Sequence, residues 1–412
     1  MLLMLLAAPA QAETTPVTLN QAIQTALEQS LAVDEASVET SLGVQSATEG
    51  IGGFLPTLSA STSTGDSSLA DLGSGLWSTR LDLSQPVVNA TTIFGLLNGI
   101  KQAGISKAQS RQILGKLILD VENAYYGLAR TQALVESAER SYERARENLK
   151  LTERRYELKD ASNAEKLRAE ASLLSAEQEL ISARTSLEQN QRILSDLLGY
   201  ESTEPFRTSE LPDAEEPYNL STTIISEAVI SENPDYDVLK RQARLTDLAY
   251  WGAWASILPS LNLTASRSWS QDEVFPSDWD AGTDSYGLSV SIPLADLKGK
   301  ALSVNRARLE RKNSRISMAR QELAFRQQLA SLLATQESSY KGWEVAVKNV
   351  ELSREVYRLT SRSYELGAAS LADLLEVETE LVQAERALVE AKAAYWTSRA
   401  ELNYFLGTSL ED

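Results

Sequence analysis

The sequence contains neither cysteine nor histidine. Disulfide bonds, thiolate or imidazole metal sites, cysteine–histidine dyads and Ser-His-Asp triads each need one of these residues, so all of them are excluded. A nucleotide-binding motif of the form G-x-x-x-x-G-K-[ST] is also missing, so the chain has no sequence signature for using ATP. We therefore expect no cofactor.

Basic clusters and long apolar runs are also missing. The chain has 39 Lys and Arg against 57 Asp and Glu, a formal net charge of −18. Because no patch of Lys and Arg offsets this negative charge, we do not expect nucleic acid as a partner. Beyond the N-terminus no stretch reaches the ~18–20 apolar residues of a membrane-spanning helix. Strands would therefore have to make any contact with lipid.

The N-terminus has the pattern of an export signal. An apolar run over residues 2–8 precedes Ala10-Gln11-Ala12, which has the small-residue spacing of a cleavage site. We predict a signal peptide over residues 1–12. The run lacks a basic n-region, as expected if its start is truncated.

Proline is absent from two long stretches, between Pro86 and Pro205 and after Pro293. Since proline in a helix interior costs roughly 3 kcal/mol, these stretches can form long helices. A helix from Pro86 to about Glu157 would be roughly 100 Å long at ~1.5 Å per residue. Matched proline pairs bracket two further segments, which we predict to be β-hairpins, at about 54–86 and 257–293.

Each bracketed segment alternates apolar and polar residues. Trp77, Thr79, Leu81 and Leu83 share one face of a strand, and the residues between them share the other. Residues 286–292 alternate in the same way, and residues 58–62 and 261–265 do so more weakly. This pattern, over about ten residues, is typical of transmembrane β-barrel strands, although a soluble sheet also produces it. Four strands leave two open edges, which lipid does not tolerate. Closure needs several copies, with eight strands from two chains or twelve from three.

The chain is also duplicated. Residues 156–199 and 364–407 align at an offset of 208, and leucine-type residues recur every seventh position in both. This spacing is coiled-coil patterning and predicts long antiparallel helical hairpins. The duplication predicts a first structural repeat over residues 13–199, a linker over 200–224 and a second repeat over 225–412. We expect helical turns, or tips, at about 159–163 and 366–371.

The duplicated plan, the proline-bracketed hairpins and the segment from Ser363 to Leu375 resemble the TolC-like outer-membrane efflux family. The resemblance covers nearly the whole chain, from about residue 19 to residue 407. It implies a mainly α fold with a β-barrel part: a homotrimer with a twelve-stranded barrel in outer-membrane lipid and a long periplasmic α-barrel. The implied function is an export duct, which receives cargo from a periplasmic adaptor and an inner-membrane pump of RND or ABC type.

The resemblance also implies roles at the tips. The pattern Tyr-x-x-Gly-x-x-Ser-x-x-Asp-Leu-Leu occurs in full in the second repeat, whereas the first has Lys159 in the glycine position and Glu165 in the aspartate position. The expected adaptor contacts are Ala161, Ser162, Gly367, Ala369 and Ser370. The expected residues of the gate at the periplasmic entrance are Asp373, Glu376, Glu165, Arg168, Tyr156 and Tyr364.

Four of the gate residues, Asp373, Glu376 and the two tyrosines, also have a simpler interpretation. Asp373 and Glu376 lie near a predicted helix start, where the helix dipole favours anions; around a threefold axis the same carboxylates would form rings that favour cations. The two tyrosines are expected either to pack beneath the turns or to hydrogen-bond across the gate. Five aromatic residues suit the interfacial girdle of a membrane barrel, namely Trp77, Tyr250, Trp251, Trp254 and Trp269.

Two other function classes compete with the duct. A periplasmic or surface coiled-coil scaffold would explain the heptads and the acidity, but not four alternating strands between paired prolines. An enzyme that uses carboxylates, such as a glycosidase, needs a pair of Asp or Glu residues. Their surroundings must raise the pKa of a catalytic carboxyl group. The sequence shows no Gly-rich or aromatic context of that kind.

Overall fold

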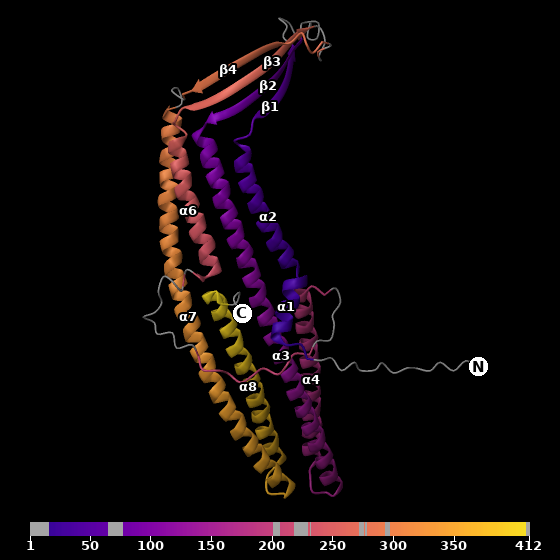
Figure 1. Cartoon of the computed structure of the whole chain (residues 1–412). Coiled ribbons are helices and arrows are strands. Elements are labelled where there is room, and N and C mark those ends of the chain that lie inside the picture. Colours follow the sequence, from indigo (N-terminus) through magenta and orange to yellow (C-terminus); the bar gives the residue numbers. More distant parts are fainter. Residues whose placement is uncertain are drawn as a thin grey trace, which may run out of the picture. The chain divides into compact units, whose positions relative to one another are not determined.

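A computed structural model describes residues 16–64, 77–200, 207–217, 230, 232–271, 276, 278–292 and 297–408. The predicted signal peptide lies outside these residues. The helices in the described part of the chain do not include one with the length and apolarity of a membrane span. The described elements are α1 (Leu19–Gln29), α2 (Leu31–Gly52), β1 (Thr57–Thr64), β2 (Trp77–Val88), α3 (Ala90–Glu157), α4 (Asn163–Leu198), α6 (Pro234–Ala255), β3 (Ser260–Gln271), β4 (Thr283–Ser291), α7 (Leu297–Glu365) and α8 (Leu371–Leu406) (Figure 1).

These elements confirm the predicted fold class. Both proline-bracketed segments are β-hairpins, and both proline-free stretches are helical hairpins, with turns after Glu157 and after Glu365. The chain divides into two compact units, and each unit contains segments of both repeats. The first comprises Met1–Glu35, Gln112–Pro234 and Phe325–Asp412, and the second comprises Ala36–Arg111 and Asp235–Ala324.

The second unit carries one antiparallel sheet with the strand order β1-β2-β3-β4 (Figure 1). Its register sorts the side chains by polarity, because residues directly opposite each other share a face. Leu58 pairs with Leu83, and Leu263 pairs with Leu288. The opposite face is formed mostly by short polar side chains, such as Ser59, Ser63 and Ser266, together with Arg80 and Asp82 of β2. One face is therefore mainly apolar, with the ion pair of Arg267 and Asp284 on it, and the other is rich in serine.

Most large apolar side chains on this face of the sheet are exposed in the described part of the chain. Tyr286 is 80% exposed and Leu288 is 65% exposed, although apolar side chains of this size normally lie inside a soluble protein. Leu58, Leu263 and Val290 are likewise exposed on this face. A contiguous exposed apolar surface marks contact with lipid or with another protein.

The helices of the second unit pack closely through small residues. Where α2 meets α3, a Cβ atom added to Gly50 would lie 2.8 Å from Leu96 Cα, and one added to Gly43 would lie 2.8 Å from Ser106 Cβ. A Cβ atom on Gly99 would collide with the carbonyl oxygen of Ser46. Because the obstacle at Gly99 is backbone, it cannot move aside as a flexible side chain can.

We expect Gly99→Ala to lower the free energy of unfolding by about 1–3 kcal/mol, the usual cost of an overpacked contact. Gly95→Ala in the same helix is the matched control, since a Cβ atom there meets nothing within 4 Å. The control should be neutral or stabilising by up to ~1 kcal/mol, because alanine favours helix over glycine. Thermal melts of the two variants in detergent, followed by circular dichroism, test this; equal melting temperatures would contradict it.

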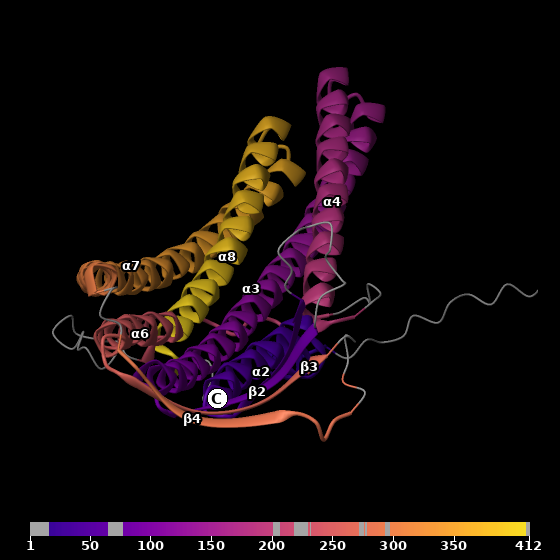
Figure 2. The same cartoon turned by 90° about the horizontal axis from the view of Figure 1, so that it is seen from above.

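The first unit contains the lower parts of both helical hairpins, in which α3 lies beside α4 and α7 beside α8 (Figure 2). Both return helices end on a glycine in the left-handed conformation, Gly199 at φ 79° and Gly407 at φ 77°. The first lies against the backbone of Gln29 and the second against that of Glu232, so an added Cβ would be 2.5 Å from a carbonyl oxygen in each case.

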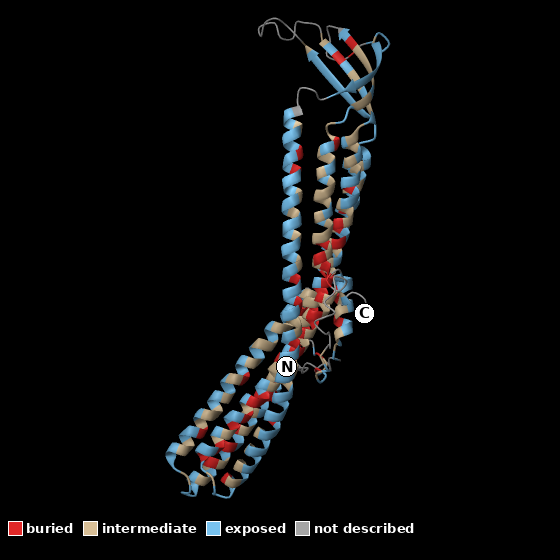
Figure 3. Cartoon of the chain, turned by 90° about the vertical axis from the view of Figure 1, so that its left-hand side faces the viewer, coloured by how far each residue is buried: buried red, intermediate tan, exposed pale blue. Residues whose placement is uncertain are grey.

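An apolar core joins the elements of the first unit near these helix ends. Its members come from α1, α3, α4 and α8, and Val121, Leu128 and Leu194 are fully buried in it. Buried residues continue along the helices toward the tips (Figure 3). A second, smaller cluster around Leu371 and Leu374 lies at the tips themselves.

Candidate functional site at the hairpin tips

The two tips adopt the same turn despite their different residues. Gly367 has φ 76° and Lys159 has φ 63°, the latter being the one positive-φ residue other than glycine in the described chain. The Gly367 amide donates to the Tyr364 carbonyl at 3.0 Å, and the Lys159 amide donates to the Tyr156 carbonyl at 3.0 Å. Lys159 therefore has the same turn geometry as Gly367, although the left-handed conformation is unfavourable for a residue with a side chain.

Both return helices begin with a capping box. Ser162 caps α4 together with Glu165, and Ser370 caps α8 together with Asp373. The Asp373 carboxylate accepts from the Ser370 amide at 2.9 Å and from its hydroxyl at 2.8 Å. The backbone hydrogen bond from Ser370 lowers the pKa of Asp373, and the equivalent bond from Ser162 lowers the pKa of Glu165. Both carboxylates thus act as helix caps.

The two tip tyrosines differ in environment. Tyr364 is 1% exposed and shares a hydrogen bond with the Thr152 hydroxyl of α3 at 3.2 Å. The Arg155 guanidinium lies 4.9 Å from the centre of the Tyr364 ring. Tyr156 is 41% exposed and lies near Lys166 of its own hairpin. The structure therefore brings Tyr364, but not Tyr156, into contact with the other hairpin.

The remaining predicted tip residues lie at the surface. Glu376 and Arg168 are exposed, and Arg168 is close enough to Glu165 to lower its pKa slightly further, after the larger effects of the Ser162 hydrogen bonds. The residues expected to contact an adaptor are exposed or half-buried in the turns and first helical positions, and these are Ala161, Ser162, Gly367, Ala369 and Ser370.

The five predicted girdle aromatics belong to the second unit. Trp251 and Trp254 on α6 are 55% and 49% exposed, and Tyr250 stacks edge-on with Trp251 at 5.3 Å. Trp77 is half-buried at the start of β2. Trp269 is 4% exposed because Trp279 packs edge-on against it at 5.1 Å. Trp279 itself is 56% exposed and was not singled out from the sequence.

Sequence reasoning also missed a charged column on α8. Every seventh residue from Glu378 is charged, namely Glu378, Glu385, Lys392 and Arg399. Each of them comes three residues before one of the leucine-type positions of the same helix. The signal was available, since the first repeat has Glu170, Glu177 and Arg184 at the same offset. Burial distinguishes the two columns. Glu378 and Glu385 are 5% and 6% exposed, whereas the Arg184 side chain is 59% exposed.

The buried acids of this column meet basic and polar groups of α3 and α7. Glu378 accepts from the Asn148 side chain at 2.9 Å, and Arg144 Nε lies 3.6 Å from its other oxygen. Glu385 lies 3.8 Å from Arg144 Nη2 and accepts from Arg354 at 3.2 Å. Burial raises the pKa of Glu378 more than the nearby Arg144 lowers it. We call Arg144, Glu378 and Glu385 the charge cluster.

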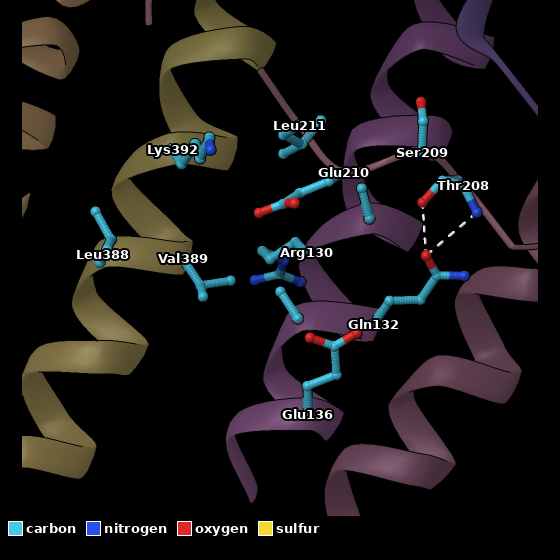
Figure 4. Close-up of a pocket in the computed structure, with 12 residues that line it drawn as sticks. Arg130, Gln132, Glu136, Thr208, Ser209, Glu210, Leu211, Leu388, Val389 and Lys392 are labelled. Carbon is cyan, nitrogen blue, oxygen red and sulfur yellow. Dashed lines mark hydrogen bonds between the residues drawn. The ribbon is translucent and has the colours of Figure 1, made fainter. Parts of the chain in front are cut away.

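Farther from the tips, residues 207–217 cross α3 and α8 and are fastened by side chains. Gln132 accepts from the Thr208 amide and hydroxyl, as Figure 4 shows. Trp396 donates to the Pro212 carbonyl at 3.0 Å, and Tyr395 donates to that of Glu215 at 2.8 Å. A cavity of about 290 Å³ lies under this segment, with Arg130, Lys392 and apolar groups in its wall (Figure 4). Among the described residues no acidic group is arranged to hold a metal ion.

Comparison with known proteins identifies the family. A family model described as outer membrane efflux protein matches residues 22–200 and 231–408. The chain belongs to this outer membrane efflux protein family. This result confirms the resemblance inferred from the sequence, places the protein in the outer membrane, and makes it a transport component rather than an enzyme.

Named relatives of this efflux family protein serve secretion and efflux. The alkaline protease secretion protein AprF of Pseudomonas aeruginosa is 25% identical over 340 residues, covering 79% of this chain and 69% of AprF. The probable efflux pump outer membrane protein TtgC of Pseudomonas putida is 23% identical over 302 residues, covering 71% of this chain and 60% of TtgC.

Solved structures show the same fold. The structure of CusC superposes with a TM-score of 0.82 at 16% identity, covering 97% of this chain and 94% of CusC. The outer-membrane channel OprN superposes with a TM-score of 0.80 at 19% identity, covering 94% and 89%. The arrangement of four strands and long helices is therefore that of the outer membrane efflux family.

Proposed function

We propose that three copies of this chain form a passive export duct that spans the outer membrane and receives cargo from a periplasmic adaptor and an inner-membrane pump. The observation that carries the proposal is that the described sheet has two edge strands and the described helices have exposed apolar stripes. Such edges suit a head-to-tail ring, in which one edge of each copy meets the opposite edge of the next.

The sheet supplies the first pair of edges. β1 and β4 are its outer strands, and among the described residues each pairs with a strand on one side only. In lipid each unpaired backbone group costs several kcal/mol, so the sheet requires closure. Three sheets of four strands give twelve, an even number that suits outer-membrane barrels. The apolar face would then meet lipid and the serine-rich face would line a water-filled lumen.

The helices supply further edges in each unit. In the first unit, α7 exposes an apolar residue at every seventh position, and α4 exposes Leu167, Leu174 and Ile181 at the same spacing. In the second unit, α7 exposes Leu302, Leu309, Ile316 and Leu323 at the same spacing, and α2 exposes Val44 and Ile51, which are seven residues apart. Seven-residue apolar spacing is the pattern of helices that pack against another helix, so both units have stripes for a neighbouring copy.

The mass of the detergent-extracted protein tests the proposal. Light scattering with detergent correction should give three chains, and the purified particle should conduct ions across a planar lipid bilayer. A monomer or dimer that stays in solution without detergent would overturn the duct and favour a coiled-coil scaffold.

The acidic tip is the proposed cation-selective part of the entrance. Asp373→Asn combined with Glu376→Gln keeps side-chain shape and the oxygen that caps α8, but removes six negative charges from a trimer, two from each chain. We expect weaker selectivity for cations and weaker block by multivalent cations, because rings of carboxylates attract them at a constriction. Reversal potentials and block curves in planar bilayers measure both.

Glu365→Gln is the control for this prediction. Glu365 ends α7 and is paired with Arg362 at 3.0 Å, so its neutralisation should leave selectivity unchanged. If the Asp373 and Glu376 variant kept the reversal potential of the native channel, neither carboxylate would act in cation selection, and Asp373 would be a helix-capping group alone.

A further inference from the structure

The contact between α3 and α8 changes character along its length. It is apolar near residues 117–129, where Ala393 and Ala400 of α8 join the core, and apolar again at the tips. Between these two regions it holds the charge cluster. Two buried carboxylates of α8 thus lie between two apolar regions of the same contact.

The ion pairs of the cluster are incompletely hydrogen-bonded. Arg144 lies 3.6 Å from Glu378 and 3.8 Å from Glu385. Its Nε and Nη2 atoms and Glu378 Oε1 are buried without a hydrogen-bond partner. A buried ion pair offsets the cost of desolvation only when its geometry is good and its remaining polar atoms are bonded. Glu378 accepts from Asn148, and Glu385 accepts from Ser137 and Arg354. The ion pairs through Arg144 are longer than hydrogen bonds, so this part of the cluster meets the condition only in part.

We propose that Glu378 is a positioning residue of the entrance: its buried charge weakens the contact between α3 and α8 and so sets how readily the two helical hairpins of one protomer part. This inference rests on the proposed duct. When the hairpins part, water enters the contact and solvates the carboxylate and the Arg144 guanidinium. The buried charge therefore favours the parted arrangement, while the apolar regions on either side favour the closed one.

The alternative interpretation is that the cluster is a latch that holds the hairpins together. The two interpretations predict opposite results for Glu378→Gln. Glutamine keeps an oxygen that accepts from Asn148 Nδ2, and Arg144 keeps Glu385 as its ionic partner. If Glu378 weakens the contact, the variant closes more tightly, whereas if Glu378 is a latch, the variant opens.

The experiment is single-channel recording of the purified trimer in planar bilayers, together with a thermal melt. We expect Glu378→Gln to lower the ratio of open to closed time about tenfold, equivalent to about 1.4 kcal/mol, and to raise the melting temperature. Glu390→Gln is the control, because Glu390 joins the same two helices through a partly exposed pair with Arg130 at 2.9 Å. The control should change neither quantity.

The dependence on pH gives a second readout. The pKa of Glu378 is raised in the closed contact, so the closed arrangement binds the proton more tightly and becomes less stable as pH rises through that pKa. Open time should therefore increase with pH in the native channel, and this component should vanish in Glu378→Gln. The other charged or titratable groups around the carboxylate are Arg144 and Glu147 on α3, Arg354 and Tyr357 on α7, and Glu385 on α8.

Two results would overturn the inference. One is an open time that is unchanged or increased in Glu378→Gln while the trimer remains intact by light scattering. The other is a pH dependence that persists unaltered in the variant. Failure of the duct itself would be recognised separately, because the native protein would then not conduct.

Discussion

Leu288→Arg should abolish insertion of the protein into the outer membrane. Leu288 is 65% exposed in the middle of β4 and shares the apolar face of the sheet with Leu263, its partner on β3. An arginine on the lipid side of a barrel costs about 2–4 kcal/mol at the midplane, and a trimer would carry three of them. The protein should then be found in the soluble or aggregated fraction rather than in outer membranes.

Ser289→Arg is the matched control, because the substitution is one residue away on the same strand. Successive side chains of a strand point to opposite faces, and Ser289 lies opposite Asn262 on the polar face. An arginine there would point into water, so we expect normal insertion and a conductance that reports the added charge. Membrane fractionation of both variants tests the assignment of faces. If Ser289→Arg failed to insert and Leu288→Arg inserted, lipid would contact the serine-rich face.

Most of the fold follows from the sequence, because its signals are local and repeated. Proline is disfavoured inside a helix, so its absence indicates where long helices can form. The two proline-free stretches contain α3 with α4 and α7 with α8. Period-two alternation placed all four strands, because pleating alone determines which side chains share a face. The turn at Lys159 is harder to predict, since a lysine does not favour the left-handed region that it occupies. There the hairpin, rather than the residue, determines the conformation.

The interactions within the tip could be predicted only in part. The capping role of Asp373 and Glu165 follows from spacing along one helix. The different environments of Tyr156 and Tyr364 do not, because they depend on how two hairpins pack together. The duplication suggested that the tyrosines were equivalent, yet Tyr364 lies against Arg155 and Thr152 of the other hairpin while Tyr156 is exposed.

The charge cluster shows the same limit. Glu170 and Glu378 occupy the same position in the two repeats, and nothing in their local sequence tells which of them is buried. Burial depends on the neighbouring helix: the second copy faces Arg144 and Asn148 of α3. Sequence patterns therefore predict the elements and their exposed faces well, and predict poorly the contacts by which the two repeats differ.

Leu352→Glu should prevent assembly of the trimer. Leu352 is 67% exposed and belongs to an apolar stripe with Val345 and Leu359 on α7 and Leu366 in the turn that follows it, which are 67%, 52% and 71% exposed. Counted from the tips, this stripe has the same seven-residue step as Leu167, Leu174 and Ile181 on α4, and the two helices run in opposite directions. A stripe of this kind on each hairpin fits antiparallel packing of α7 on α4 of the next copy.

Burying one leucine contributes about 1.5–3 kcal/mol, and a glutamate in its place would also bury an unpaired charge. Because a ring of three copies contains this contact three times, the loss is repeated at each interface. We expect light scattering to give Leu352→Glu the mass of one chain at a protein concentration where the native protein has the mass of three.

Val347→Glu is the control for the stripe. It makes the same kind of change on the same helix, at a valine that is 39% exposed but lies two residues after Val345 and so outside the seven-residue column. We expect the control to remain trimeric. Equal loss of assembly in both variants would mean that negative charge on α7, rather than the stripe, disrupts the ring. If Leu352→Glu remained trimeric, the stripe would not be needed for assembly. Pairing of β1 with β4 of the next copy would then hold the three copies together.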